Sequence, residues 1–411
     1  MSAWKKTLLA FACSSALLLT ACNDDNDHVA VDRYDSYLTE TTYTQDSVIA
    51  ASRINVMQYT MPSVTGQPIT ASALVFTPRT PRPKDGWRVV VWEHGTVGSG
   101  DQCAPSNNQL NPRFRILAES LLAAGYVIVA PDYEGLGEKG IHPYLNLKSA
   151  AQSAIYAQKA YQERYASQVK GTWMSVGQSQ GGHASLATAE YAQTDANYLG
   201  AVAAAPASSL GYIIQYIAPN LLKDVLLAES AGLVEKGTAA AGYAELLAYA
   251  AYVTTGIRAY QPNFDYKAVF HPRSQPLVEA ALGTTGDNGL CLDELGPRFT
   301  DDILQYVAEN PGKTVLDYPA LIEDFDQNPV IAAFLAENQP ATKYISKPVM
   351  IVQGKLDAAV PYVVTEQLAE DLTAKGSEVE LHLVEGAGHT QAIVLKTKEI
   401  VEFIQQHMPA R

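Results

Sequence analysis

Hydrophobic and polar positions alternate early in the chain and then give way to continuous apolar runs. Val48–Tyr59 and Ile69–Pro78 read as extended segments with turn-forming residues between them. This pattern predicts an antiparallel hairpin at one edge of a sheet. The next extended segment, Arg88–Trp92, is apolar at successive positions. Such a run is typical of a strand that is covered on both faces.

From that point, predicted strands and helices alternate along the chain. Further buried strands are expected at Tyr126–Ala130, Thr172–Val176, Leu199–Ala205, Pro348–Val352 and Val379–Val384, and helices at Pro112–Ala124, Lys148–Tyr165, His183–Ala192, Val363–Ala374 and Ala392–His407. This alternation favours an α/β fold, in which helices flank both faces of a mostly parallel sheet.

The alternation stops after Pro206 and resumes only at Pro348. The segment between them is much longer than a crossover connection needs. It is rich in Ala, Leu and Tyr, with helical patterns at Leu221–Leu227, Tyr243–Tyr252 and Phe299–Ala308. We therefore predict a core made of residues 45–206 and 347–411, with residues 207–346 inserted as a large helical cap that shapes a ligand pocket. A purely structural appendage is the alternative.

The first residues have the features of an export signal. Two lysines precede the apolar run Leu8–Leu19, which is too short to span a bilayer. The run leads into Leu-Thr-Ala-Cys, which resembles the lipobox of bacterial lipoproteins, where the cysteine is lipidated and becomes the new N-terminus. We expect residues 1–22 to be a lipoprotein signal peptide, Cys22 to carry the lipid, and residues 23–44 to be an acidic tether. The protein would then be exported and lipid-anchored to a bacterial membrane on the periplasmic or extracellular side; an ordinary secreted protein is the alternative.

Charge and cysteine content narrow the possible partners. The net charge of −14 argues against binding to nucleic acid or other polyanions. Two of the four cysteines lie in the first 22 residues, which leaves Cys103 and Cys291. Two cysteines in an exported chain tend to pair, so we predict a disulfide, with two separate thiols as the alternative. The sequence has no C-x-x-C or H-E-x-x-H motif and its histidines are scattered, so no metal site is expected.

The strongest chemical signal is the Gly-Gln-Ser-Gln-Gly-Gly sequence at residues 177–182, which joins a predicted strand to a predicted helix. Strand, G-x-S-x-G and helix together are the context of a nucleophile elbow. The serine of such an elbow sits on a turn so tight that the residues two before and two after it must lack side chains. Ser179 is therefore the candidate nucleophile, and a glycine-rich loop that happens to contain serine is the alternative.

An acid and a histidine follow the last two predicted strands. Asp357 comes after the first of these strands and His389 after the second, at the edge where α/β sheets bind ligands. The chain order Ser179, acid, histidine is that of α/β-hydrolases. His389 would act as the general base, and Asp357 would fix its tautomer. Asp132 and Glu385 are rival acids; we expect Asp132 to be a structural acid, and Glu385 is too close to His389 along the chain.

An oxyanion hole requires backbone N–H donors near the nucleophile. Residues 93–96, Glu-His-Gly-Thr, follow a predicted strand and are similar to the HG-type oxyanion motif. We expect the N–H groups of Thr96 and Gln180 to be the donors. His94 would orient its loop, and His183, on the helix after the elbow, would pack or form a hydrogen bond there.

Five segments together resemble the secretory lipase family of α/β-hydrolases, the lipase A type. They are 94–96 (His-Gly-Thr), 101–106 (Asp-Gln-Cys-Ala-Pro-Ser), 131–137 (Pro-Asp-Tyr-Glu-Gly-Leu-Gly), 142–145 (His-Pro-Tyr-Leu) and 177–183 (Gly-Gln-Ser-Gln-Gly-Gly-His). The likeness spans roughly residues 45–408. It implies an α/β-hydrolase core, a helical cap inserted after the sixth strand, and ester hydrolysis without a cofactor.

These observations favour a serine carboxylic ester hydrolase, a lipase or esterase that cleaves acylglycerols or similar small acyl esters through an acyl-enzyme on Ser179. A capped serine peptidase or amidase is one alternative, because acids such as Glu245 and Glu323 in the insertion could hold a substrate amine. A polyester-degrading esterase is another. A non-catalytic binding protein on this fold would usually lack the serine or the histidine. No obligate protein partner is evident.

The composition of the insertion predicts how it meets the substrate. Several tyrosines lie among Ala, Leu and Ile, and two of them, Tyr249 and Tyr252, are three residues apart and share a helix face. A tyrosine ring with one polar end suits a wall between an acyl chain and water. We therefore expect an apolar acyl-binding wall with tyrosine hydroxyls at its rim, with packing of the cap onto the core as the alternative role.

Overall fold

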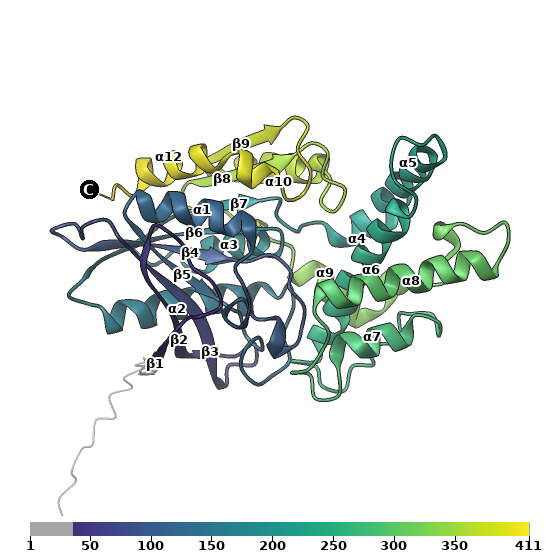
Figure 1. The fold of residues 1–411 in the computed structure, drawn as a ribbon, viewed down its shortest axis with the longest axis horizontal. Coiled ribbons are helices and arrows are strands. Elements are labelled where there is room, and N and C mark those ends of the chain that lie inside the picture. The colour runs from purple at the N-terminus through teal and green to yellow at the C-terminus, as the bar shows by residue number, and fades with distance from the viewer. Residues whose placement is uncertain (1–35, 411) are drawn as a thin grey trace, which may run out of the picture. The chain divides into compact units, whose positions relative to one another are not determined.

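One nine-stranded sheet organises residues 36–410, the part of the chain that the computed structural model describes. Its strands are β1 (Tyr37–Thr42), β2 (Ala51–Pro62), β3 (Pro68–Pro78), β4 (Trp87–Glu93), β5 (Tyr126–Pro131), β6 (Val169–Gln178), β7 (Tyr198–Ala204), β8 (Val349–Gly354) and β9 (Val379–Val384). Their order in the sheet is β1-β2-β3-β5-β4-β6-β7-β8-β9 (Figure 1). Pairings among β1, β2, β3 and β5 are antiparallel, and those from β5 to β9 are parallel. The mostly parallel α/β fold predicted from the sequence is confirmed.

The sheet begins earlier than the sequence pattern indicates. Residues 23–44 were expected to be a tether, but Tyr37–Thr42 form β1 and pair with β2, so this part of the prediction is wrong. β1 is an edge strand whose side chains are mostly exposed, and its threonines and glutamate therefore resemble a solvated linker in sequence. The predicted signal peptide, Cys22 and residues 23–35 of the predicted tether lie outside the described residues.

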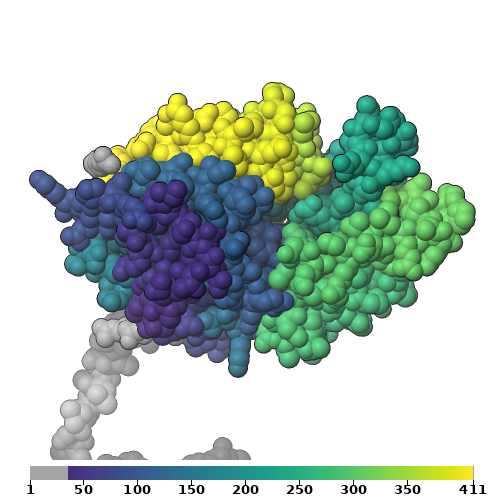
Figure 2. All heavy atoms as spheres, in the orientation of Figure 1, coloured from purple at the N-terminus to yellow at the C-terminus, as the bar shows by residue number. Residues whose placement is uncertain are grey.

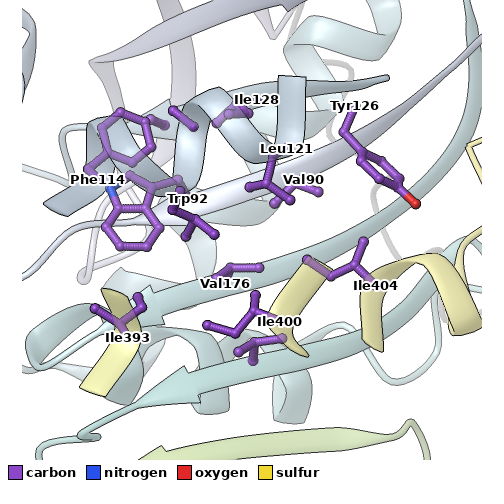
Figure 3. Packing of buried hydrophobic residues seen from close by; sticks show 14 of the residues in the cluster. Val90, Trp92, Phe114, Leu121, Tyr126, Ile128, Val176, Ile393, Ile400 and Ile404 are labelled. Carbon is purple, nitrogen blue, oxygen red and sulfur yellow. The ribbon is translucent and has the colours of Figure 1, made fainter. Parts of the chain in front are cut away.

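Helices cover both faces of the sheet. They are α1 (Pro112–Ala123), α2 (Leu147–Arg164), α3 (Gln180–Tyr191), α10 (Tyr362–Ala374), α11 (Ala392–Leu395) and α12 (Thr397–His407), with short 3-10 turns η1 (Asp101–Cys103) and η2 (Pro105–Asn107) after β4. Alternate residues of each strand serve the two faces. In β4, Val90 and Trp92 pack with α1, α11 and α12 (Figure 3), whereas Val89 and Val91 pack with α2, α3 and α10.

A helical insertion separates β7 from β8. Its elements are α4 (Leu210–Tyr212), η3 (Ile213–Ile217, a π-helix), α5 (Ala218–Ser230), α6 (Thr238–Ile257), α7 (Gln275–Leu282), α8 (Leu292–Glu309), η4 (Val315–Asp317), η5 (Phe325–Gln327) and α9 (Pro329–Glu337). These elements share their own apolar cluster, which includes Leu247, Phe270 and Phe299. In the space-filling view they form a lobe, teal to green, beside the sheet and its helices (Figure 2). Among the described residues, no helix has both the length and the hydropathy to cross a membrane.

Candidate active site

Ser179 lies between β6 and α3 on a turn that requires glycine on both sides. Its backbone adopts φ 62° and ψ −118°. A Cβ atom on Gly177 would lie 2.0 Å from the carbonyl oxygen of Gly181, and a Cβ atom on Gly181 would lie 1.8 Å from the carbonyl oxygen of Glu93. Neither contact is sterically possible, so the chain can make this turn only with glycine at both positions. The turn presents the Ser179 side chain at the carboxyl end of β6.

The structure brings Ser179, His389 and Asp357 together from three strand ends. His389 Nε2 lies 2.8 Å from Ser179 Oγ, and His389 Nδ1 lies 2.8 Å from Asp357 Oδ2. Since a carboxylate only accepts hydrogen bonds, Nδ1 carries the imidazole proton and Nε2 is free to accept from the serine hydroxyl. The other oxygen of Asp357 accepts from the N–H groups of Ala359 and Val360 at 2.9 and 2.8 Å. The arrangement has the geometry of a serine–histidine–aspartate triad.

The two rival acids have other partners. Asp132 is buried, and it accepts a hydrogen bond from the Ser72 hydroxyl at 2.7 Å and one from the Ser106 N–H at 2.9 Å. Burial raises the pKa of Asp132 to about 6. Glu385 is exposed and pairs with Lys355 at 2.6 Å. Asp132 therefore ties β3 to η2, which fits the structural role expected from the sequence.

The loop after β4 passes over the elbow. A Cβ atom on Gly95 would lie 3.5 Å from Cβ of Ser179, and the neighbouring Thr96 lines the same cavity as Ser179. Gln180 is the first residue of α3, and the first N–H groups of a helix have no partner within the helix. Both predicted oxyanion residues thus lie beside Ser179. The donor role of Thr96 and Gln180 remains a prediction.

Residues 142–145 contact both of these positions. Tyr144 Oη lies 2.6 Å from Thr96 Oγ1, and Gln180 Nε2 lies 2.9 Å from His142 Nε2. His142 Nδ1 lies 2.8 Å from the carbonyl oxygen of Glu134, so Nδ1 donates and Nε2 accepts from the Gln180 amide. Burial lowers the pKa of His142 to about 4, which keeps this tautomer neutral. In the sequence these residues stand out only as part of a family motif, with no role of their own.

The other two buried histidines near the elbow bind backbone carbonyls. His94 Nδ1 and Nε2 lie 2.7 and 3.1 Å from the carbonyl oxygens of Gly95 and Asp132, and its ring packs on Tyr133. His183 Nε2 lies 3.0 Å from the carbonyl oxygen of Asn338. Burial lowers the pKa of both histidines. His94 therefore supports its own loop, as expected from the sequence, whereas His183 links α3 to the end of α9 in the insertion.

A cavity of about 860 Å³ opens onto Ser179 and His389. Its sheet-domain wall is largely apolar and includes Leu74, Trp92, Leu110, Phe114, Ala130 and Ile393. The rings of Trp92 and Phe114 stack with centroids 4.9 Å apart (Figure 3). The insertion contributes α6 and the start of α8 to the opposite wall, and charged side chains enter from both sides: Arg113 from α1, Glu245 from α6 and Asp293 from α8.

The two tyrosines predicted to form the acyl wall have different positions. Tyr249 lines the cavity, and its hydroxyl donates to the carboxylate of Glu245. Tyr252 is fully buried: its hydroxyl donates to the carbonyl oxygen of Leu290 at 3.0 Å, and its ring packs on Tyr144. The wall prediction therefore fits Tyr249 but is wrong for Tyr252. Although the two share a helix face, Tyr252 lies a turn further along α6, where the helix meets the sheet domain.

The predicted disulfide between Cys103 and Cys291 is present, with Cα atoms 5.4 Å apart. It joins η1 to the residue that precedes α8, and both cysteines line the cavity. Next to it, the N–H of Leu292 donates to the carbonyl oxygen of Val97 at 2.9 Å. The insertion is thus covalently tied to the loop that carries Thr96.

Among residues 36–410, no group of three or more His, Cys, Asp or Glu side chains is arranged to hold a metal ion.

Comparisons with known proteins agree with this architecture. The model of the prolyl oligopeptidase family matches residues 323–410, which carry Asp357 and His389. No curated protein sequence matches the chain. Among solved structures, a mutant of the rice cell wall degrading esterase LipA from Xanthomonas oryzae is similar with a TM-score of 0.66 and 20% identity, over 92% of this chain and 100% of that one.

Two further structures extend the comparison. A putative hydrolase from Legionella pneumophila has a TM-score of 0.64 and 19% identity, over 90% of this chain and 98% of that one. Lipase A from Candida antarctica in its closed state has a TM-score of 0.62 and 16% identity, over 91% of this chain and 82% of that one. At these identities the likeness establishes the fold, which is that of the α/β-hydrolases.

Proposed function

We propose that this protein is a serine hydrolase that cleaves carboxylic esters through an acyl-enzyme on Ser179. The observation that carries the proposal is the alignment of Ser179 Oγ, His389 and Asp357, with 2.8 Å at each hydrogen bond, at the floor of a cavity with an apolar wall. An α/β-hydrolase fold supports the same chemistry by analogy.

The chemistry follows from the tautomer of His389. Its Nε2 takes the Ser179 proton as Oγ attacks the ester carbonyl carbon, and Asp357 stabilises the imidazolium that forms. The negative oxygen of the tetrahedral intermediate would accept from the N–H groups of Thr96 and Gln180, each worth about 3–4 kcal/mol. Collapse breaks the carbon–oxygen bond to the alcohol, which leaves with the proton from His389. Water then attacks the acyl-enzyme by the same steps, with His389 first taking the proton of the water and then returning it to Ser179 as the acid is released.

The cavity indicates the kind of ester. Leu74, Trp92, Phe114 and Ile393 offer a hydrophobic surface to an acyl chain, and its volume of about 860 Å³ is in the range of pockets for small ligands. We propose acylglycerols or similar acyl esters as the substrates, in keeping with the resemblance to secretory lipases. The similar Xanthomonas oryzae protein is a cell wall degrading esterase, so polymeric esters belong in the same screen.

A peptidase or amidase is the second candidate. Two observations favour it: the C-terminal match to the prolyl oligopeptidase family and the exposed carboxylate of Glu245 in the cavity wall, which could bind a substrate amine. Glu323, the other acid considered from the sequence, lines a separate cavity in the insertion.

Three reagents separate these functions. A fluorophosphonate probe should label Ser179 in the wild type and leave Ser179→Ala unlabelled; an unlabelled wild type contradicts the serine hydrolase proposal. Turnover of p-nitrophenyl acyl esters of different chain lengths should exceed turnover of aminoacyl p-nitroanilides by a wide margin. The reverse preference would establish the peptidase instead, and Glu245→Gln should then raise KM for the anilides.

We also propose that the protein is exported and anchored by a lipid on Cys22. The lipobox-like sequence before Cys22 motivates this, and a disulfide between Cys103 and Cys291 suits an oxidising compartment. Replacing Cys22 by serine should move the protein from the detergent phase to the aqueous phase in a membrane fractionation. An unchanged distribution would contradict the anchor.

A further inference from the structure

Gln353 and His389 both donate hydrogen bonds to the carboxylate of Asp357, the acid of the triad. Gln353 is the fifth residue of β8, and its side chain is completely buried. Gln353 Nε2 lies 2.9 Å from Asp357 Oδ2, and His389 Nδ1 lies 2.8 Å from the same oxygen. One carboxylate oxygen therefore accepts from both side chains.

The surroundings of Gln353 allow only one orientation of its amide. Nε2 also faces two other acceptors, the carbonyl oxygens of Gly354 at 3.1 Å and Val360 at 2.9 Å. On the other side, Oε1 accepts from the hydroxyl of Thr365 at 2.7 Å. A flipped amide would place its oxygen against three acceptors, so the N–H group must point at Asp357.

The donors around Asp357 divide between its two oxygens. Oδ1 is held by backbone N–H groups of Ala359 and Val360 in the turn that follows Asp357. Among the described residues, the side chains that hydrogen-bond to Oδ2 are those of Gln353 and His389. The position and charge of the oxygen that faces the base therefore depend on Gln353.

We infer that Gln353, held by Thr365, is a positioning residue of this triad. It fixes the rotation of the Asp357 carboxylate so that Oδ2 faces His389, and its N–H takes up part of the negative charge that would otherwise act on the imidazole. The inference rests on the proposed function, because it concerns how readily His389 accepts the proton of Ser179. It assigns a role to a polar side chain in an otherwise apolar strand.

Other charged groups around the acid stay the same when Gln353 is replaced. From the insertion, Tyr249 is close enough to feel the acid: burial, and then the charges of Glu245 and Asp357 among others, raise its pKa. On the side of β8 and β9, Lys355 is paired with Glu385 at 2.6 Å. A change in pH dependence on replacing Gln353 can therefore be traced to the Gln353–Asp357 contact.

The test uses the rate at which a fluorophosphonate labels Ser179, since this step needs an activated serine but no knowledge of the natural substrate. In Gln353→Leu, Oδ2 loses one donor, the carboxylate can rotate, and its charge acts more strongly on His389. We expect the labelling rate constant to fall by about 10- to 100-fold. Losses of this size are typical when a residue that orients a metal-binding side chain through a hydrogen bond is replaced. Because the imidazolium is then held more strongly, the acidic limb of the rate should move upward by about half a pH unit or more.

Two threonines on α10 test whether the hydroxyl that holds Gln353 matters, while the Gln353 side chain itself is left in place. Thr365→Val removes the hydroxyl that holds Oε1 of Gln353, and it should show the same changes to a smaller degree. Thr373→Val is the control, because the Thr373 hydroxyl binds the carbonyl oxygen of Ala369 in its own helix at 2.8 Å. This control should label like the wild type. If Gln353→Leu does not fold, Thr365→Val decides: a wild-type rate and pH limb would overturn the inference.

A double-mutant cycle separates positioning from a general loosening of the loop. In an Asp357→Ala background, Gln353→Leu should cause little further loss, since the residue acts through the missing carboxylate. Equal fold-losses in both backgrounds would overturn the inference, as would an unshifted pH limb in Gln353→Leu. A wild type that is not labelled at all contradicts the proposed function instead, so the two failures are distinguishable.

Discussion

At the residue scale, the proposed chemistry depends on Ser179, which has a backbone conformation that residues other than glycine seldom adopt. Its φ of 62° is imposed by the turn between β6 and α3 rather than by the serine itself, and alanine can replace it without disturbing the neighbouring glycines. We therefore expect Ser179→Ala to remain folded and to lose esterase activity by several orders of magnitude, about 10⁴-fold or more. A melting curve and an esterase assay on the same preparation would check that the variant is folded and that its activity is lost. A variant with half the wild-type rate would exclude Ser179 as the nucleophile.

Asp357 and Asp132 can be distinguished by the same substitution. Asp357→Asn keeps the shape of the triad but favours the wrong imidazole tautomer, so turnover near neutral pH should fall by about 10⁴-fold. Asp132→Asn should leave turnover within a few-fold, because Asp132 contacts Ser72 and Ser106 and not His389. Near-normal turnover in Asp357→Asn would mean that another acid orients His389.

Asp132 also predicts a dependence of stability on pH. Burial raises its pKa from 3.8 to about 6, so in that window the folded chain holds a proton that the unfolded chain has lost. The free energy of unfolding therefore falls as pH rises through the window, and the loss persists above it. A difference of this size is worth about 3 kcal/mol.

Asparagine has no such proton to lose. Relative to the wild type, Asp132→Asn should therefore gain about 2–3 kcal/mol when both are moved from about pH 4 to about pH 7. Urea unfolding at the two pH values measures this. Parallel curves for the two proteins would show that Asp132 does not titrate in that window.

At the scale of elements, the loop of residues 142–145 connects the insertion to the predicted oxyanion residue Thr96. Tyr144 contacts Thr96 through its hydroxyl and Tyr252 of α6 through its ring. A Cβ atom on Gly256 would lie 2.7 Å from the backbone nitrogen of Tyr144, so α6 packs directly on this loop. The position of Thr96 is thus linked to the cap helix through one side chain.

Removing the Tyr144 hydroxyl tests that link. Tyr144→Phe keeps the ring packing but frees Thr96, so kcat should fall by roughly tenfold with little change in KM, since the interaction matters when the oxyanion forms. Tyr126→Phe is a matched control: the Tyr126 hydroxyl is also buried, and it donates to the carbonyl oxygen of Met408 at 2.7 Å. It should lower the melting temperature and leave kcat unchanged. Equal kcat for both variants would show that the Tyr144 hydroxyl does not position Thr96 for the reaction.

The two tyrosines of α6 should respond differently to alanine. Tyr249→Ala opens the cavity wall and should change the preferred acyl length, with each methylene worth about 1–3 kcal/mol of discrimination. Tyr252→Ala removes a buried ring and should cost about 3–5 kcal/mol of stability with an unchanged length preference. Activity across short, medium and long acyl esters, together with melting temperatures, distinguishes them. A length preference that shifts only in Tyr252→Ala would reverse the assignment.

These elements also show which features a sequence can reveal. Strands buried on both faces, the glycines of the elbow, and the acid and histidine at strand ends were predictable, because steric and periodic constraints act over a few residues. Gln353 was missed since its partner Thr365 and its target Asp357 meet only after β8 and α10 pack. Its one sequence signal is a polar residue at the end of an apolar strand. The prediction that Tyr252 lines the acyl wall is wrong, because helix periodicity shows which residues share a face but not what that face contacts.

On the scale of the whole molecule, the disulfide holds the insertion against the sheet domain. Cys103 and Cys291 are 188 residues apart, so in the chain-entropy picture their bond stabilises the fold by about 5 kcal/mol. Replacing both by serine should lower the free energy of unfolding by an amount of that order, and activity should fall because both side chains line the cavity. Denaturant unfolding and an esterase assay check this, and a non-reduced peptide map should contain the joined peptides. Free thiols at both positions would refute the bond.

The insertion between β7 and β8 also delays the synthesis of His389 relative to that of Ser179. His389 follows Ser179 by 210 residues. At about 5–20 residues per second, the ribosome makes the base roughly 10–40 s after the nucleophile. During that interval the growing chain carries a serine with no group to accept its proton, and the strand that brings His389 into place has not been made. For the proposed hydrolase, a partly made chain that ends before His389 therefore lacks the base that the reaction needs.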